Sequence, residues 1–119
     1  MKDLTDKEME LMEVIWANQA GLTMRELYEL LPEPRTHFNT VSTFVRRLEE
    51  EGFISHETIK GRLFKYKPAI SRWEYERREQ KSFLDRFFKG SGIDFVKHLF
   101  AEEQVSKEEL EELIREINK

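Results

Sequence analysis

Apolar side chains recur along most of this chain at the three- and four-residue spacing of an α-helix, which predicts a mostly helical fold. The first helix is expected to begin at Thr5, which forms the pattern of a capping box with Glu8. Leu4 and Met9 fit the hydrophobic staple around that cap. The helix then presents one apolar stripe to a core, made of Met9, Leu11, Met12, Ile15 and Trp16.

A second, short helix is predicted over residues 24–31, with three of its leucines facing inward. These are Leu27, Leu30 and Leu31. Pro32 and Pro34 end the helix, since neither proline can continue it.

The third helical segment, residues 36–52, carries two opposite faces. Its apolar stripe follows the spacing i, i+3, i+4, i+7 and consists of Val41, Phe44, Val45 and Leu48. Its polar face has the same spacing two residues earlier and consists of Asn39, Ser42, Thr43 and Arg46, flanked by Thr40 and Arg47. Gly52 suits the position just past the helix end, where a left-handed residue is favoured.

After Gly52 the hydrophobic period changes to two, which is typical of β-strands. Residues 53–59 and 62–67 are expected to form a hairpin, joined at Lys60 and Gly61. Three helices followed by a basic-tipped hairpin predict a winged helix-turn-helix domain over residues 1–70. A small α+β domain with no DNA role would have the same order of elements.

Residues 71–119 return to the helical period, with capping-box patterns at Ser71 and Ser106 and a break at residues 90–92. About fifty residues with this much apolar surface cannot bury it alone, so we expect a helical dimerisation domain of a homodimer. The residues predicted to form its interface are Phe83, Phe87, Phe88, Val96, Leu99, Phe100, Leu110, Leu113, Ile114 and Ile117. Packing of these helices onto the N-terminal domain of the same chain is the alternative.

Composition excludes several classes of protein. The 119 residues include no cysteine, which rules out disulfides, thiolate metal sites and cysteine nucleophiles. No apolar run approaches the ~20 residues needed to cross a bilayer. The stretch at residues 1–16 is acidic where a signal peptide would be basic, so we expect a cytoplasmic protein that is not inserted in a membrane.

The formal net charge of −4 hides a segregation of charge along the chain. Residues 35–70 carry seven basic and four acidic side chains, whereas residues 1–34 carry three basic and eight acidic ones. A basic block between acidic flanks suggests a contact surface for an anionic partner, although chance fluctuation of a few charges would look similar.

The sequence gives little support to an enzyme. His37, His56 and His98 are widely separated and lack the spacing of metal ligands. The glycines at residues 90–92 lack the spacing of a phosphate-binding loop and read as a helix-breaking turn. No catalytic residue, metal site or cofactor is predicted.

DNA binding fits the side chains better, because a helix with short polar residues can enter the major groove. Asn can pair with adenine, Arg with guanine, and the Thr methyl group can contact thymine. The candidate base-reading residues are Asn39, Thr40, Ser42, Thr43, Arg46 and Arg47. Lys60 and Arg62 at the hairpin tip would contact phosphates. An ordinary hydrated helix face and an exposed turn are the alternatives.

The chain also resembles the penicillinase-repressor family of transcription factors. Residues 4–16 are similar to the family's opening, and residues 40–48, followed by residues 49–54, are similar to its recognition helix and the exit into the wing. Further similarity lies in Gly61-Arg62, in residues 66–68 and 83–90, and in the helix over 106–117.

This resemblance implies a homodimeric repressor of a (pseudo)palindromic double-stranded DNA operator, in one branch of a beta-lactam-response operon. In that branch a membrane sensor metallopeptidase triggers cleavage in the dimerisation domain, and the matching position here is Leu99-Phe100. The copper-sensing branch uses a cysteine cluster that this chain lacks. The competing hypothesis is a winged-helix protein-interaction module that does not bind an operator.

Overall fold

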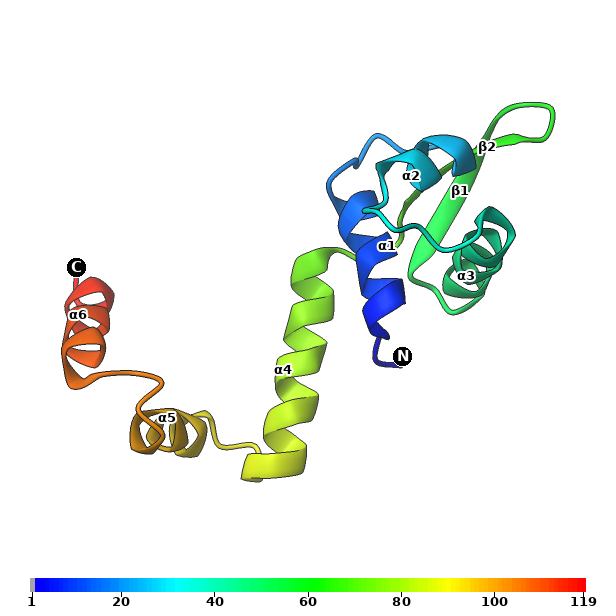
Figure 1. Cartoon of the computed structure of the whole chain (residues 1–119). Coiled ribbons are helices and arrows are strands. Elements are labelled where there is room, and N and C mark those ends of the chain that lie inside the picture. Colours follow the sequence, from blue (N-terminus) through cyan, green and yellow to red (C-terminus); the bar gives the residue numbers. More distant parts are fainter. Residues whose placement is uncertain (1) are drawn as a thin grey trace. The chain divides into compact units, whose positions relative to one another are not determined.

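The computed structural model describes residues 2–119, and over these residues it contains six helices and one two-stranded antiparallel sheet. The chain divides into two compact units, Met1–Glu76 and Arg77–Lys119. The elements of the first unit lead into the long helix in which the division falls (Figure 1). They are α1 (Asp6–Trp16), α2 (Met24–Leu30), α3 (Phe38–Glu50), β1 (Ile54–Lys60), β2 (Leu63–Pro68) and the start of α4 (Arg72–Phe88).

The capping box predicted at the start of α1 is confirmed. Thr5 Oγ1 accepts a hydrogen bond from Glu8 N at 3.3 Å, and Glu8 Oε1 accepts one from Thr5 N at 3.0 Å. Glu8 is also buried, and its carboxylate is paired with Lys2 Nζ at 2.7 Å. Burial raises the pKa of Glu8, but the hydrogen bonds from Lys2 and Thr5 outweigh it and hold the pKa below its ordinary value.

The core of the first unit is built from all three helices, the hairpin and the first turn of α4. Phe53, Met12 and Leu27 are among its fully enclosed side chains. The other buried apolar residues are Leu11, Ile15, Trp16, Leu22, Leu31, Val41, Val45, Leu48, Ile54, Ile70 and Tyr75. Most of the positions predicted to form the apolar stripes of the first and third helices therefore do line one core.

Tyr75 closes this core from α4. Its ring lies 6.0 Å from the rings of both Trp16 and Phe53, measured between centroids. Its hydroxyl accepts a hydrogen bond from Leu4 N at 2.9 Å, and Trp16 Nε1 donates to Ile70 O at 2.9 Å. The first turn of α4 is thus held to the start of the chain by polar and aromatic contacts.

The prediction for the second helix is wrong at one residue. Helix α2 ends at Leu30, which is 53% exposed, whereas Leu31 is buried. Leu30 is still helical and lies about 60° around the helix axis from Leu27, so it falls outside the narrow buried face of this short helix. The backbone becomes extended at Leu31, and that side chain is buried. The helix also begins with a capping box, Thr23 with Glu26, that we had not predicted although the sequence pattern is present.

Helix α3 starts two residues inside the predicted segment, at Phe38, and is followed by Gly52 in the left-handed region at φ 90°. Phe44 is only half-buried within its apolar stripe. The hairpin turn is formed by Gly61 and Arg62, one residue later than predicted, because the register shifts between Thr58 and Lys60 and Lys60 still pairs with Leu63.

The second unit contains the rest of α4, then α5 (Gly92–Ala101) and α6 (Lys107–Ile117). The capping box predicted at Ser106 is confirmed in full. Only half of the one predicted at Ser71 forms: Ser71 Oγ accepts from Glu74 N at 3.0 Å, but the Glu74 carboxylate contacts the Ser71 hydroxyl. Lys89 and Gly90, both at positive φ, end α4 at the predicted break.

Aromatic rings gather inside this second unit. Phe83 and Phe95 are 5.1 Å apart between ring centroids, and Phe88 lies 5.2 Å from Phe95. His98 extends the cluster, with its ring 5.8 Å from that of Phe88. None of the residues 77–119 is buried in the single chain, although α5 and α6 both carry apolar stripes.

Candidate nucleic-acid interface

Helix α3 is held by its apolar side and leaves its polar side open. Val41, Val45 and Leu48 are buried in the core. On the opposite side Asn39, Thr40, Arg46 and Arg47 are exposed, whereas Ser42 and Thr43 are half-buried. The structure therefore brings together the candidate residues of this helix on the side away from the core, with Ser42 and Thr43 less exposed than the others.

Local hydrogen bonds fix the start of this face. His37 caps the helix, because its Nδ1 accepts a hydrogen bond from Asn39 N at 3.3 Å. Thr43 Oγ1 donates to Asn39 O at 3.0 Å. The Thr43 hydroxyl is thus satisfied within the helix, and its methyl group remains for apolar contact.

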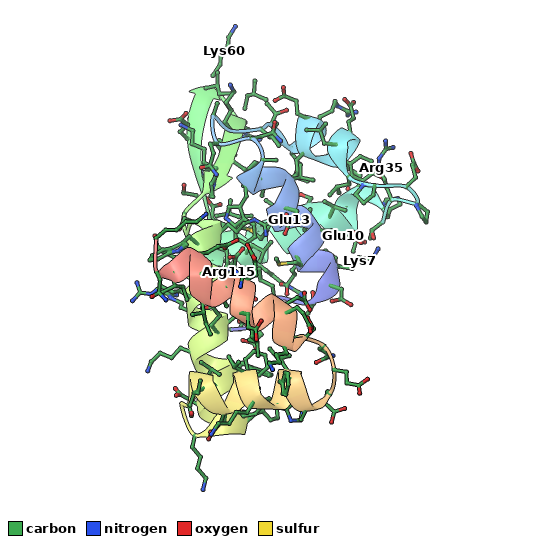
Figure 2. The ribbon with its side chains drawn as sticks, turned by 90° about the vertical axis from the view of Figure 1, so that its left-hand side faces the viewer. Lys7, Glu10, Glu13, Arg35, Lys60 and Arg115 are labelled. Atoms are coloured by element: carbon green, nitrogen blue, oxygen red, sulfur yellow. The ribbon has the colours of Figure 1, made fainter. Side chains whose placement is uncertain are left out.

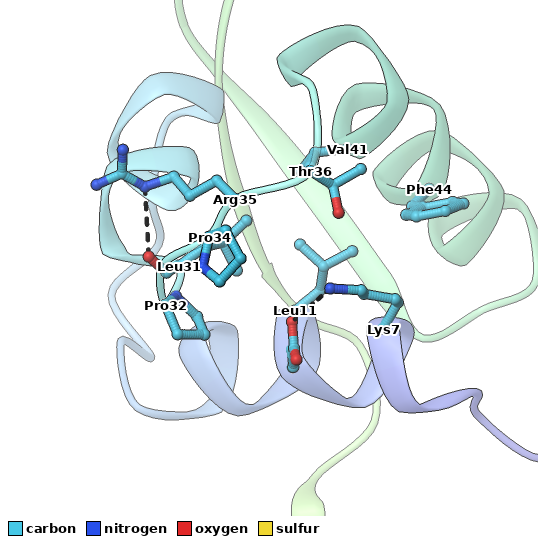
Figure 3. Close-up of a pocket in the computed structure, with 10 residues that line it drawn as sticks. Lys7, Leu11, Leu31, Pro32, Pro34, Arg35, Thr36, Val41 and Phe44 are labelled. Atoms are coloured by element: carbon cyan, nitrogen blue, oxygen red, sulfur yellow. Dashed lines mark hydrogen bonds and ion pairs between the residues drawn. The ribbon is translucent and has the colours of Figure 1, made fainter.

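The basic block of the sequence separates into paired and unpaired cations. Arg35 is used locally: it forms an ion pair with Glu33 at 3.1 Å and donates from Nε to Leu31 O at 3.3 Å (Figure 3). Lys67 pairs with Glu57 at 2.8 Å. The cations of this block that form no ion pair within residues 2–119 are Arg46, Arg47, Lys60, Arg62 and Lys65.

The hairpin places the predicted phosphate contacts at the far end of the first unit. Lys60 ends β1 and extends away from the body of that unit (Figure 2). Arg62 lies in the turn that follows and is exposed. Both cations are therefore carried by the wing and not by the helix face, as the sequence predicts.

One contact between α3 and the hairpin was not predicted from the sequence. Glu49, in the last turn of α3, bonds through its carboxylate to His56 Nδ1 on β1. The His56 ring lies 4.4 Å from that of Phe64 and 5.9 Å from that of Tyr66, measured between centroids. This pair ties the end of α3 to the hairpin, and it becomes visible only in the folded chain.

The electrostatics of Tyr66 show that the same region also contains Arg46. Burial raises the pKa of Tyr66, the Glu49 carboxylate raises it further, and Arg46 acts in the opposite direction. The base of the wing and the last turns of α3 thus form one charged and aromatic cluster.

The predicted dimerisation residues lie on all three helices of the second unit. Phe87, Phe100, Leu113, Ile114 and Ile117 are each at least 47% exposed. Phe83 is 37% exposed, and the half-buried members are Phe88, Val96, Leu99 and Leu110. The bond between Leu99 and Phe100 lies within the last turn of α5.

Among residues 2–119, no group of three or more His, Asp or Glu side chains is arranged to hold a metal ion. Within that range no helix is both long enough and apolar enough to cross a membrane.

Three packed helices, the third with an open polar face, and a following antiparallel hairpin define a winged helix-turn-helix protein. The model of the penicillinase repressor family matches residues 4–119, and this chain belongs to that family. The penicillinase repressor of Bacillus licheniformis is 33% identical over 110 residues, which cover 92% of this chain and 85% of that protein. The methicillin resistance regulatory protein MecI of Staphylococcus aureus is 24% identical over 117 residues, or 98% of this chain and 94% of MecI.

Solved structures agree with the fold. The solution structure of Bacillus licheniformis BlaI, a monomeric form in complex with the blaP half-operator, matches with a TM-score of 0.52 and 31% identity, over 62% of this chain and 89% of that one. The crystal structure of MepR, a transcription regulator of a Staphylococcus aureus multidrug efflux pump, matches with a TM-score of 0.52 over 98% of this chain and 76% of MepR. At 23% identity the second match supports the fold alone.

Proposed function

We propose that this protein is a homodimeric transcriptional repressor that binds a (pseudo)palindromic operator through α3. The observation that carries the proposal is the open side of α3, where Arg46 and Arg47 are exposed and form no ion pair within residues 2–119. A face intended only for hydration would gain from neighbouring carboxylates, as Arg115 does beside Glu112. The half-operator in the BlaI complex supports the same role.

In this proposal α3 enters the major groove and its residues read base edges. Arg46 would form two hydrogen bonds to a guanine, and Asn39 two to an adenine. The Thr43 methyl group would contact a thymine methyl, since its hydroxyl already donates to Asn39 O. Ser42 and Thr43 are small enough to let the helix backbone approach the bases.

The wing would supply affinity without sequence information. Lys60 and Arg62 are exposed at the tip of the hairpin and carry charge toward any strand that passes it. Contacts from such cations to phosphates release counterions, so they make binding depend on salt. The Glu49–His56 bond would keep the wing at a fixed position relative to the reading helix.

The second unit would form the interface that relates the two copies of the dimer by two-fold symmetry. Its apolar residues remain exposed in the single chain, and a second copy could cover them with an equivalent surface. Two copies of α3 would then read half-sites spaced by about one helical turn, ~10 bp, or by a multiple of it.

We further propose that the regulated genes belong to a beta-lactam or related stress response, and that a sensor metallopeptidase acts upstream. Cleavage between Leu99 and Phe100 would cut α5 in its last turn and remove part of the apolar surface of the second unit. Mass spectrometry of the protein from cells treated with a beta-lactam tests this point. A fragment ending at Leu99 is the expected product, and an intact chain during induction would contradict it.

Selection of bound oligonucleotides from a random-sequence pool tests the function itself. A repressor should enrich a two-fold symmetric sequence, and its affinity should fall steeply as salt rises. Failure to retain any oligonucleotide would overturn the proposal and favour the protein-interaction module. Enrichment of one half-site without a second, symmetry-related copy would support DNA binding and contradict the symmetric operator.

A further inference from the structure

A groove lies on the first unit between the start of α2, the first residue of α3 and the strand β2. It is lined mainly by Arg25, Phe38, Arg62, Leu63, Phe64 and Tyr66. Its floor is largely aromatic, and two arginines stand beside it, Arg25 on α2 and Arg62 in the hairpin turn. Of the residues that line this groove, only Arg62 belongs to the DNA-contacting surface predicted from the sequence, and α2 does not.

The walls of the groove are fixed by local structure. Leu22, just before α2, forms a two-way backbone bridge with Tyr66 on β2, with N–O distances of 3.0 and 2.7 Å. The Arg25 guanidinium lies 5.9 Å from the centre of the Phe38 ring, in a cation–π contact. Phe38 in turn packs edge-on against Tyr28 at 5.1 Å. The position of Arg25 beside the start of α3 is therefore set before any ligand binds.

The charge of the groove has one sign. Arg25 and Arg62 form no ion pair within residues 2–119, and the residues that line the groove include no carboxylate. Two other arginines of the first unit are matched with acids: Arg35 with Glu33, and Arg72 with Glu13 and Glu76. A groove with two unmatched guanidinium groups and an apolar floor is complementary to a polymer of phosphates and sugars.

The place of the groove relative to α3 identifies the strand. The major groove is about 12 Å wide, so a helix inserted in it has a sugar–phosphate strand along each side. This groove adjoins the start of α3 on the side of the wing, where one of those strands must pass. The strand would run between α2 and the hairpin and meet both arginines.

We infer that this groove holds one sugar–phosphate strand of the operator, with Arg25 and Arg62 contacting its phosphates and Phe64 packing against deoxyribose. The inference rests on the proposed function and extends it to a third element, since α2 then contributes a contact of its own. Arg25 would fix the register of α3 in the major groove without reading a base.

Salt titration of operator binding tests the role of Arg25. Arg25→Ala should lower the salt slope by about 0.9 per half-site and weaken binding about eight-fold per half-site near 0.1 M salt, equally for operator and random DNA, because each protomer loses one phosphate contact. Arg25→Lys should restore most of the slope, since the charge is kept. The matched control is Arg35→Ala, which removes an arginine already paired with Glu33 and should leave the slope unchanged.

The outcomes separate this inference from the proposed function. If the unaltered protein binds no DNA, both fall together. If it binds its operator and Arg25→Ala keeps the full slope, only the groove assignment is overturned. An unchanged slope with phenyl phosphate shifting the NMR signals of Phe64 and Tyr66 would assign the groove to a small aromatic anion instead.

Discussion

The two units of this chain contrast in how they use their apolar residues. The first encloses fourteen buried apolar side chains, including Phe53 and Met12, which have no significant exposed surface. The second has no buried residue in the single chain and leaves Ile117 71% and Phe87 65% exposed. A small unit can form helices without completing a core, and the missing half of the core must then come from another surface.

Two capping boxes show that the contrast is not one of local structure. Thr5 with Glu8 begins α1, and Ser106 with Glu109 begins α6 through the same pair of hydrogen bonds. Glu8 is buried and Glu109 is exposed. The two units therefore begin these helices with the same capping hydrogen bonds and differ in whether other side chains bury the capping glutamate.

The largest effect is expected in the enclosed core. Phe53→Ala should destabilise the first unit by about 3–5 kcal/mol, because a fully buried ring is replaced by a cavity. Urea unfolding at several protein concentrations measures it. The loss should be the same at every concentration, and a loss that depends on concentration would show that the first unit needs a partner to fold.

A substitution in α6 tests whether the exposed apolar residues of the second unit form a dimer interface. Ile114→Glu should weaken dimerisation at least about 100-fold, since each dimer loses two apolar contacts of about 1.5–3 kcal/mol and gains two charges. Sedimentation equilibrium measures the dissociation constant. Glu116→Ala, on the opposite side of the helix, is the control, and a monomeric unaltered protein would contradict the dimer.

The next effect separates base reading by α3 from phosphate contact by the hairpin, both within the first unit. Arg46→Ala should cost about 1–3 kcal/mol and relax discrimination at one base position per half-site, as expected for an arginine that reads guanine. Lys60→Ala is the comparison, because loss of one phosphate contact from each protomer weakens binding to all sequences alike and lowers the salt slope by about one per half-site. A uniform loss for Arg46→Ala would make that residue a phosphate contact.

The smallest effect compares the two capping glutamates. Hydrogen bonds lower the pKa of both Glu8 and Glu109. A lowered pKa in the folded state adds stability above the pKa of the unfolded chain, about 4.3, and this stability is lost as the pH falls below it. Glu8→Gln should lower the free energy of unfolding by about 1 kcal/mol at neutral pH. That free energy should then fall less steeply as the pH is lowered.

Thermal unfolding between pH 3 and pH 7 measures this effect, with Glu109→Gln as the matched exposed variant. Glu109→Gln should change the pH dependence of stability less, because water can replace the hydrogen bonds of Glu109. Equal effects of the two substitutions would mean that burial adds nothing to the cap of α1.

Most of the helices could be predicted from the sequence because their signals are local. The boxes at Thr5 and Ser106 lie within four residues of chain, and the stripe of Val41, Val45 and Leu48 within two helical turns. The prediction for Leu30 was wrong because the spacing of apolar residues does not give the width of the buried face: Leu30 is helical and follows the buried Leu27 by three residues, yet it is exposed.

The rest depends on contacts that the spacing of residues does not encode. The hydrogen bond from Leu4 N to Tyr75 joins residues that lie 71 positions apart. Glu49 and His56 meet only because the chain reverses at Gly52. Of the cations in residues 35–70, only the structure separates Arg35, which Glu33 holds, from those that remain unpaired.

Tyr75 has a consequence for where this polypeptide can be cut. A chain ending at Ile70 would lose the ring that lies between Trp16 and Phe53 and the hydroxyl bonded to Leu4 N. A chain ending at Glu76 keeps both. We therefore expect limited proteolysis to leave a resistant fragment that extends past Tyr75. We also expect that a fragment must include the first turn of α4 to bind a half-site.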